Sequence, residues 1–144
     1  MTQGGAAKRT VRVVAALIPQ PGDDSRFLVQ QRLPGGSRGL LWEFPGGKVE
    51  PGESEPEALA RECREELDVQ LQVGRRLWAG RHEYSDLTVD LVLYAARLTS
   101  GEPKTLGANA LAFLTPVEMQ ALPFCEADLP PLEDLVAGRL GPLG

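Results

Sequence analysis

The chain has 144 residues, of which 42% are apolar and 24% charged, a composition typical of a globular protein with an ordinary core. Its net charge of −5, without a block of Lys or Arg, argues against a nucleic-acid polymer or an anionic membrane as the partner. A single small nucleotide is compatible with this charge, because a bound cation can supply positive charge locally.

The first third of the chain shows patterns of short extended segments. Residues 11–18 (VRVVAALI) form a β-branched apolar run that predicts a buried strand. Residues 19–25 are rich in Pro, Gly and Asp and predict a turn, so the alternating segment 26–32 becomes the second arm of a hairpin. A flexible loop at 34–39 then leads to a short extended piece at 42–44.

A helix is predicted over residues 54–67. Ser54 and Glu57 have the S-x-x-E spacing of a capping box, which marks the beginning of a helix. Asp68 would follow the last turn, in the left-handed conformation that Asp tolerates better than most residues. An apolar stripe at i, i+4 and i+8 would face the core: Leu59, Cys63 and Leu67.

The remaining chain alternates between strands and helices. Strands around one central helix, followed by a closing helix, predict a layered α/β fold with a mixed sheet. We expect strands at 69–85, 87–98 and 110–114, a loop at 99–109, a helix start at Thr115-Pro116, and an amphipathic helix at 127–140.

The chemistry is concentrated in the helix at 54–67. Glu62, Glu65 and Glu66 stand at i, i+3 and i+4, so a helix places all three carboxylates on one face. Like charges this close repel each other, and a divalent cation is the simplest reason for the arrangement. Mg²⁺ prefers a few carboxylates together with waters and substrate phosphates. The pattern therefore points to metal-assisted chemistry on a phosphate compound.

The spacing around these glutamates is specific. Gly47, Glu53 and Arg61 precede them at the intervals of the Nudix box, so the segment 47–69 resembles that motif. Six fixed letters match, and a chance match in this chain is on the order of one in 10⁵. Asp68 stands where the family has Gly, and Cys63 fills an aliphatic position. The resemblance implies an α/β/α sandwich with a mixed β-sheet.

The resemblance also implies roles for single residues. Glu62, Glu65 and Glu66 match the metal-binding carboxylates of the family, and the carbonyl of Gly46 joins them as a ligand. Glu53 matches the first Glu of the box, as an additional metal group or a supporting one, and Arg61 matches the arginine that positions the carboxylates. The general base is left open between Glu62 and Glu65. The implied cofactor is Mg²⁺, with Mn²⁺ as a substitute.

Segment 40–53 (LWEFPGGKVEPGE) resembles the MutT-like branch of Nudix hydrolases. That resemblance assigns Arg32 to a substrate phosphate, Phe44 to the wall of the base pocket and Asp128 to the base edge. For Asp128 a second interpretation is nearly as strong, namely an N-cap of the last helix. Many members of this branch carry a further Glu in the loop before the last strand, whereas residues 104–114 contain no acid and Glu102 is the nearest.

The resulting expectation is a Mg²⁺-dependent hydrolase that converts a nucleoside triphosphate to the monophosphate and pyrophosphate, and so removes oxidised or excess nucleotides. The acid-free loop motivates an alternative, a nucleotide-binding regulator with little turnover. A further alternative is a hydrolase of ADP-ribose, although the Pro that such enzymes carry soon after the box is absent from 70–102. A third is an interaction domain that keeps the box by descent.

The other polar landmarks have structural interpretations. His82 is the only histidine and lies in a predicted strand, which favours a structural role. Cys63 and Cys125 lack metal-binding spacing and are expected to be free thiols in a reducing cytoplasm. No apolar run approaches membrane-spanning length, and no signal-peptide core is present. We expect one cytoplasmic domain over 1–144, with flexible ends at 1–9 and 141–144, as a monomer or homodimer.

Overall fold

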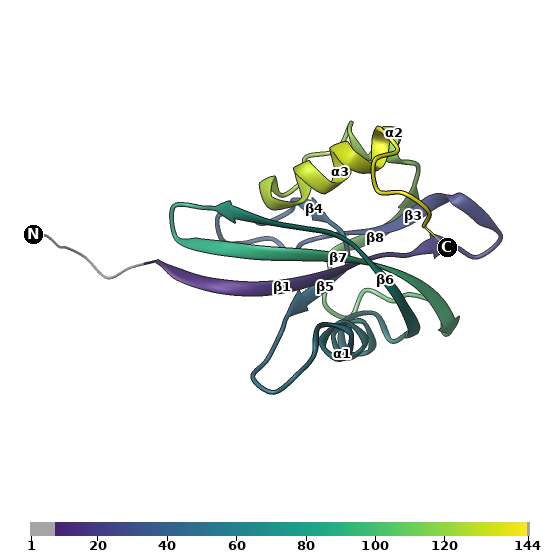
Figure 1. Cartoon of the computed structure of the whole chain (residues 1–144), viewed down its shortest axis with the longest axis horizontal. Coiled ribbons are helices and arrows are strands. Elements are labelled where there is room, and N and C mark those ends of the chain that lie inside the picture. Colours follow the sequence, from purple (N-terminus) through teal and green to yellow (C-terminus); the bar gives the residue numbers. More distant parts are fainter. Residues whose placement is uncertain (1–7, 144) are drawn as a thin grey trace, which may run out of the picture.

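Two β-sheets form the middle of the molecule in a computed structural model that describes residues 8–143 (Figure 1). In the first sheet β1 and β7 run parallel, while the outer strands pair antiparallel, so the sheet is mixed as expected. Its strands, in spatial order, are β5 (Gly46–Lys48), β1 (Arg9–Leu17), β7 (Leu87–Ser100) and β6 (Gln70–Glu83).

The second sheet is built around the hairpin arm β3. Part of the segment expected to be a turn at 19–25 is extended, because its first two residues pair with β3, which itself begins at Asp23. The turn is thus confined to Pro21 and Gly22. Gly22 has a positive φ of 84°, a conformation that suits glycine. The strands of this sheet are β2 (Pro19–Gln20), β3 (Asp23–Gln31), β4 (Trp42–Glu43) and β8 (Ala110–Leu114).

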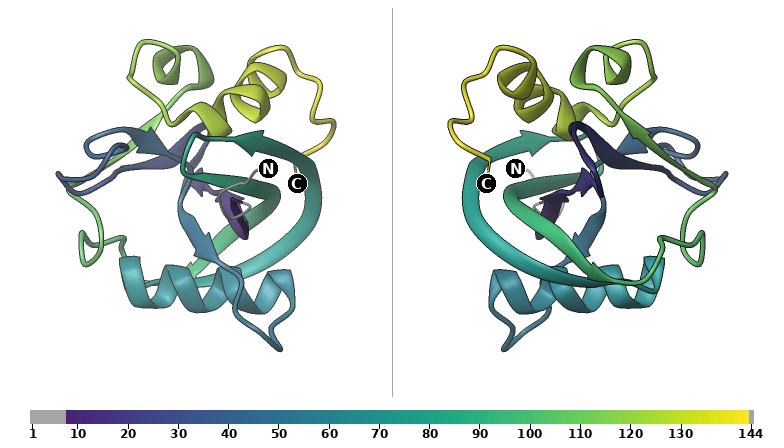
Figure 2. Two further views of the ribbon diagram at one scale, coloured as in Figure 1. Left: turned by 90° about the vertical axis from the view of Figure 1, so that its left-hand side faces the viewer. Right: turned by 90° about the vertical axis from the view of Figure 1, so that its right-hand side faces the viewer.

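Helices cover the sheets from opposite sides, which confirms the expected α/β/α layering (Figure 2). The helix α1 (Glu55–Leu67) lies on one side, against β1, β5 and β6. On the other side lie α2 (Pro116–Met119), the short helix η1 (Glu126–Asp128) and α3 (Leu129–Val136). Between residues 8 and 143, no helix has the length and apolar character needed to cross a membrane.

The sequence signals at both ends of α1 are confirmed. The Ser54 hydroxyl accepts from the Glu57 N–H, and the Glu57 carboxylate accepts from the Ser54 N–H, so the capping box is complete. Asp68 ends the helix in the left-handed region, at φ 57°. The predicted apolar stripe is buried in the core on this side of the sheets: Leu59, Cys63 and Leu67. These contacts fix which face of α1 points toward the strands.

The C-terminal helix is shorter than predicted. Residues 126–128 form a turn of 3₁₀-helix, α3 covers only Leu129–Val136, and Gly138 follows with a positive φ of 72°. The pattern over 127–140 is amphipathic, but a left-handed glycine ends the helix before 140. As for the ends expected to be flexible, residues 1–7 and 144 lie outside the described residues. Arg9 begins β1, and the flexibility of the ends stays a prediction.

Candidate active site

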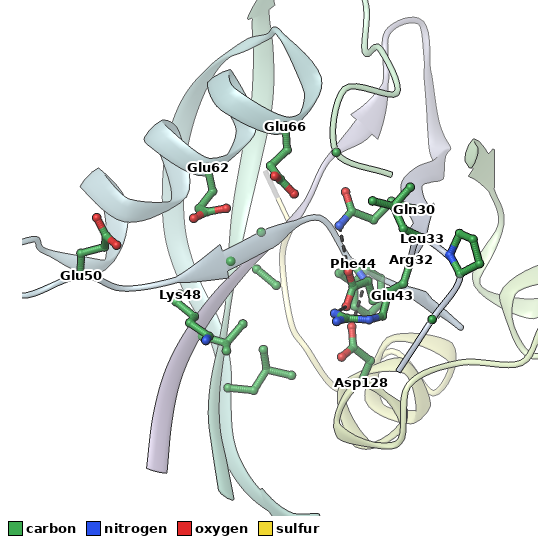
Figure 3. A pocket seen from close by; sticks show the side chains of 18 residues that line it. Gln30, Arg32, Leu33, Glu43, Phe44, Lys48, Glu50, Glu62, Glu66 and Asp128 are labelled. Carbon is green, nitrogen blue, oxygen red and sulfur yellow. Dashed lines mark hydrogen bonds and ion pairs between the residues drawn. The ribbon is translucent and has the colours of Figure 1, made fainter. Parts of the chain in front are cut away.

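A cleft of about 530 Å³ opens between α1 and the α3 side of the molecule (Figure 3). Glu62 and Glu66 point into it from α1, while Asp128 reaches it from the opposite layer. The strands supply the floor, and the chain after β3 supplies one rim. Side chains that lie far apart in the sequence therefore meet in this cleft.

Glu62 and Glu66 are the acidic wall of the cleft. Burial raises the pKa of Glu62, although the hydrogen bond from Arg61 lowers it again in part. Burial also raises the pKa of Glu66, and the negative charge of Glu62 adds to this. Both carboxylates are thus partly deprived of water and repel each other, as the repeat at i and i+4 predicts. Glu65 does not line the cleft; its side chain is 59% exposed.

Arg61 holds the remaining glutamates of the motif. Its guanidinium binds both oxygens of Glu53, at 2.6 and 2.9 Å, and this pairing lowers the pKa of Glu53 to about 2. One terminal nitrogen donates to Glu62 at 3.0 Å and to Glu65 at 3.1 Å. The other also donates to the carbonyl of Lys48, at 3.1 Å. A planar guanidinium offers five N–H donors, which makes Arg suited to such a multiple contact.

Three glycines let backbone segments pack closely around the cleft, two of them against the acidic wall. A Cβ on Gly47 would collide with the Glu62 carboxylate, and one on Gly46 would lie 2.8 Å from the Cα of Ala15. Gly107 comes from the loop before β8, and a Cβ there would lie 2.5 Å from the carboxyl carbon of Glu66. The segment in which many members of the MutT-like branch carry a further Glu thus presents a glycine to Glu66.

Glu102, the nearest acid in that loop, lies elsewhere. It lines a separate cleft with Gln20, Leu98 and Phe113, and it does not line the cleft that contains Glu66. The Gly107 N–H donates to the Glu66 carbonyl at 3.1 Å and anchors the loop to the end of α1. Within the described cleft, the loop before β8 therefore contributes backbone and no carboxylate.

The donor types fit a hard divalent cation, the kind of metal that Nudix hydrolases generally use. Glu62 and Glu66 offer carboxylate oxygens that are partly buried and mutually repelling, which is the arrangement a cation relieves. As the side chains stand, no three His, Cys, Asp or Glu side chains among residues 8–143 converge closely enough to hold an ion. Glu65 and Glu53 are turned toward Arg61 instead, so their participation requires rotation away from it.

The opposite end of the cleft is a network around Glu43. Arg32 donates to one Glu43 oxygen at 3.2 Å, and Gln30 donates to the other at 2.9 Å (Figure 3). The Phe44 N–H donates to Asp128 at 2.9 Å. Burial, followed by repulsion from Glu43, raises the pKa of Asp128 to about 8. This shift favours the protonated carboxyl group, which can donate as well as accept.

The two interpretations of Asp128 can now be compared. It occupies the N-cap position of α3, but its side chain makes no capping hydrogen bond, so the capping interpretation is wrong. Instead the side chain is 6% exposed, lines the cleft and binds the backbone of Phe44. Phe44 itself is buried at 2% exposure, with its ring 5.8 Å from that of Phe124, edge to face.

Sequence reasoning missed four polar residues of the cleft: Gln30, Glu43, Lys48 and Glu50. Gln30 and Glu43 are polar side chains in strands, and their cross-strand pairing brings them together. Gln30 is 4% exposed, and its amide oxygen has no hydrogen-bond partner. Lys48 directly follows the first Gly of the box and lines the cleft. An acid inside the apolar Trp-Glu-Phe segment was the one signal that could have pointed to Glu43.

The residues expected to be structural do not line the cleft, although the Cys125 thiol lies 3.8 Å from a Glu43 oxygen. His82 packs edge-on against Tyr84, with ring centroids 4.5 Å apart, and its Nε2 is 3.6 Å from a Glu126 oxygen. Cys63 and Cys125 are both buried free cysteines, as predicted. Burial raises the pKa of each thiol to about 12, so neither is a thiolate at neutral pH.

A mixed sheet between helices, with carboxylates of α1 facing a cleft, agrees with the hydrolase predicted from the sequence. The model of the NUDIX domain matches residues 14–134, so the chain belongs to the Nudix family. It is of the MutT-like type, because its relatives include nucleotide hydrolases of that branch. The chain is 36% identical over 131 residues to the CTP pyrophosphohydrolase of Escherichia coli, which covers 91% of this chain and 95% of that one. It is 30% identical over 96 residues to the 8-oxo-dGTP diphosphatase of Haemophilus influenzae, with 67% and 69% covered.

Solved structures give the same result. The E. coli ORF135 protein has a TM-score of 0.76 and 35% identity, with 92% of each chain covered. The MutT protein of methicillin-resistant Staphylococcus aureus has a TM-score of 0.71 and 35% identity, with 92% of this chain and 99% of that chain covered. The expected fold and family are thereby confirmed.

Proposed function

We propose that this protein is a Mg²⁺-dependent pyrophosphohydrolase of the cytoplasm that converts a nucleoside triphosphate to the monophosphate and pyrophosphate. The observation that carries the proposal is that the two ends of the cleft differ in their chemical groups. One end has the partly buried carboxylates of Glu62 and Glu66, and the other has the buried carboxyl group of Asp128. A nucleotide has the matching order of groups, with phosphates at one end and a hydrogen-bonding base at the other. The relatives, a CTP pyrophosphohydrolase and an 8-oxo-dGTP diphosphatase, support the same substrate class.

The residues that would hold the metal are Glu62 and Glu66, with Glu53, Glu65 and the carbonyl of Gly46 as further ligands. When bound, Mg²⁺ neutralises phosphate charge and lowers the pKa of a coordinated water. Glu62 or Glu65 takes a proton from the attacking water as general base. The water oxygen forms a bond to phosphorus, and the bond from that phosphorus to the bridging oxygen breaks. Arg61 supports this step by holding Glu62 in place.

The opposite end of the cleft is proposed to select the base. Arg32 binds a phosphate, while Phe44 forms part of the apolar wall. A protonated Asp128 presents both a donor and an acceptor, whereas an ionised one presents acceptors only. A base edge that offers one N–H and one lone pair is therefore the partner we infer, as found on amide-like edges of pyrimidines and oxidised purines. Discrimination by such buried polar groups is stronger than by apolar contact alone.

The test is turnover of normal and oxidised dNTPs, NTPs and ADP-ribose at pH 8 with Mg²⁺, by wild type and Glu66→Gln. We expect one triphosphate to be hydrolysed to pyrophosphate, with a loss of about 10²-fold or more in the variant, as is usual when a group that stabilises transition-state charge is removed. Asp134→Asn is the matched control, because it removes a surface carboxylate that pairs only with Arg139. Turnover that survives in Glu66→Gln contradicts the proposed site.

A second candidate function is a nucleotide-binding regulator with little turnover. The observation that favours it is Gly107, which faces Glu66 where a further carboxylate was expected. A regulator would bind a nucleotide in the presence of Mg²⁺ and give equal, near-zero turnover in wild type and Glu66→Gln. Isothermal titration with the non-hydrolysed nucleotide separates the two functions. Absence of nucleotide binding as well would instead favour an interaction domain that retains the motif by descent.

A further inference from the structure

The loop at residues 33–41, here called the rim loop, forms one wall of the cleft and is attached to a distant hairpin. Leu33, Pro34 and Gly35 line the cleft beside Arg32. The far side of the same loop contacts the turn between β6 and β7 through Arg38. The rim loop therefore connects the cleft to a distant part of the chain, because Arg38 and Asp86 are 48 residues apart in sequence.

Arg38 makes a two-point contact with that hairpin. Its two terminal nitrogens donate to the two oxygens of Asp86, at 3.1 and 2.9 Å. Its guanidinium carbon also lies 4.4 Å from the centroid of the Tyr84 ring, the geometry of a cation–π contact. A fork-like ion pair combined with stacking fixes the orientation of a guanidinium, which a Lys ammonium could not reproduce.

Tyr84 extends this contact to the base end of the cleft. Its hydroxyl oxygen accepts from the Ala127 N–H at 3.0 Å, and Ala127 directly precedes Asp128. Asp128 in turn accepts from the Phe44 N–H. One continuous chain of contacts thus runs from the rim loop, through Arg38 and Tyr84, to the carboxyl group proposed to read the base.

The conformation of the rim loop is strained, so it depends on contacts with residues outside the loop. Gly35, Gly36 and Leu40 all have positive φ, and for Leu40 the value of 63° is unfavourable because its Cβ crowds the backbone. The backbone bonds at the base of the loop, between Arg32 and Leu41, close it but leave its tip without a partner strand. Arg38 is the side chain that ties this tip to the hairpin.

We propose that Arg38 is a positioning residue that determines how the cleft encloses its nucleotide. It holds the rim loop at the cleft wall and, through Tyr84, sets the position of Asp128. This inference rests on the proposed function for its substrate, but the hold on the loop exists in the free protein. Loss of Arg38 therefore weakens nucleotide binding without affecting the hydrolytic step at Glu62 and Glu66.

The test compares Arg38→Gln, Asp86→Asn and the double variant by steady-state kinetics on the best triphosphate. We expect KM to rise about three- to tenfold in each, with kcat within about twofold, because the ion pair and the cation–π contact are each of modest strength. The double variant should equal Arg38→Gln, because Asp86→Asn removes only the ion pair, which is already absent once Arg38 is replaced. Arg38→Lys should remain impaired. Amide hydrogen exchange without nucleotide should be faster across residues 33–41 in both single variants.

Two further variants sharpen the test. Arg81→Gln breaks a comparable two-point pair, Arg81 with Asp90 at 2.7 and 3.1 Å, on the same hairpin but away from the cleft, and should leave KM unchanged. Tyr84→Phe keeps the ring beneath Arg38 but loses the bond to Ala127, so it should alter the preference among bases while exchange in the rim loop stays normal.

Unchanged KM and exchange in Arg38→Gln overturn the inference, as do additive effects in the double variant or an equal rise of KM in Arg81→Gln. If the wild type hydrolyses no nucleotide, the proposed function fails, and hydrogen exchange alone decides the hold on the loop. In that case faster exchange supports the role of Arg38, and unchanged exchange overturns it.

Discussion

The buried carboxyl group of Asp128 makes stability depend on pH in a direction unusual for an aspartate. Burial raises its pKa from the ordinary 3.8 to about 8, so the folded protein binds this proton more tightly than the unfolded chain does. The stability that the protonated group confers is complete below about pH 4 and is lost as pH rises to about 8. Replacement by Asn keeps an oxygen that can accept from the Phe44 N–H, but removes the titration.

The magnitude follows from proton linkage. Each pH unit between the two pKa values changes the free energy of unfolding by roughly 1.4 kcal/mol. The free energy of unfolding of Asp128→Asn, relative to that of the wild type, should therefore rise by roughly 3 to 4 kcal/mol between pH 5 and pH 8. The charged groups that face Asp128 are Glu43 and Arg32, with Tyr84 and Cys125 also near, and all are present in both proteins.

Urea unfolding of both proteins, without metal or nucleotide, at intervals from pH 5 to pH 9 provides the measurement. The difference in the free energy of unfolding between them isolates the titration of Asp128, because other groups contribute equally to each curve. A difference that stays constant across this range would refute the reasoning. It would mean that Asp128 is ionised in the folded protein and offers a base only acceptors.

The other predictions concern α1 and its neighbours. Gly107→Ala should displace the Glu66 carboxylate and lower kcat about 10- to 100-fold with little change in melting temperature, because small misplacements of reacting groups are costly. Leu59→Ala, at a fully buried position, should lower the free energy of unfolding in urea by about 2 to 5 kcal/mol, whereas exposed Leu106→Ala should change it by less than about 0.5 kcal/mol. Ser54→Ala should cost about 1 kcal/mol, measured by thermal unfolding, through loss of the helix cap; an unchanged midpoint would contradict the role of the capping box.

Local signals predicted α1 and its acidic face well. The capping box, the apolar stripe and the left-handed Asp68 each depend on residues within a few positions of one another, and each was confirmed. The end of α3 was predicted less well, because amphipathic periodicity continues past the glycine at which the helix ends. Periodicity reports which face is apolar but not where the backbone leaves the helix.

Long-range pairings account for what the sequence left out of the site. Glu43 enters the cleft because β4 pairs with β3, and Glu65 turns out of it because Arg61 lies one helical turn away. The rim loop was expected to be flexible from its glycines alone. Its contact with Asp86 depends on a hairpin that lies far downstream, so no local sequence pattern could predict this contact.

Arg61 has a consequence for how this protein matures. Its guanidinium supplies countercharge to Glu53, Glu62 and Glu65 from within the chain, so the acidic cluster needs no ion to be tolerated. Many metalloproteins acquire their structure together with their metal, and chelators unfold them. In this protein the positive charge of Arg61 offsets part of the repulsion among the glutamates that a bound cation would otherwise offset. We therefore expect the chain to fold without magnesium and to bind the metal afterwards.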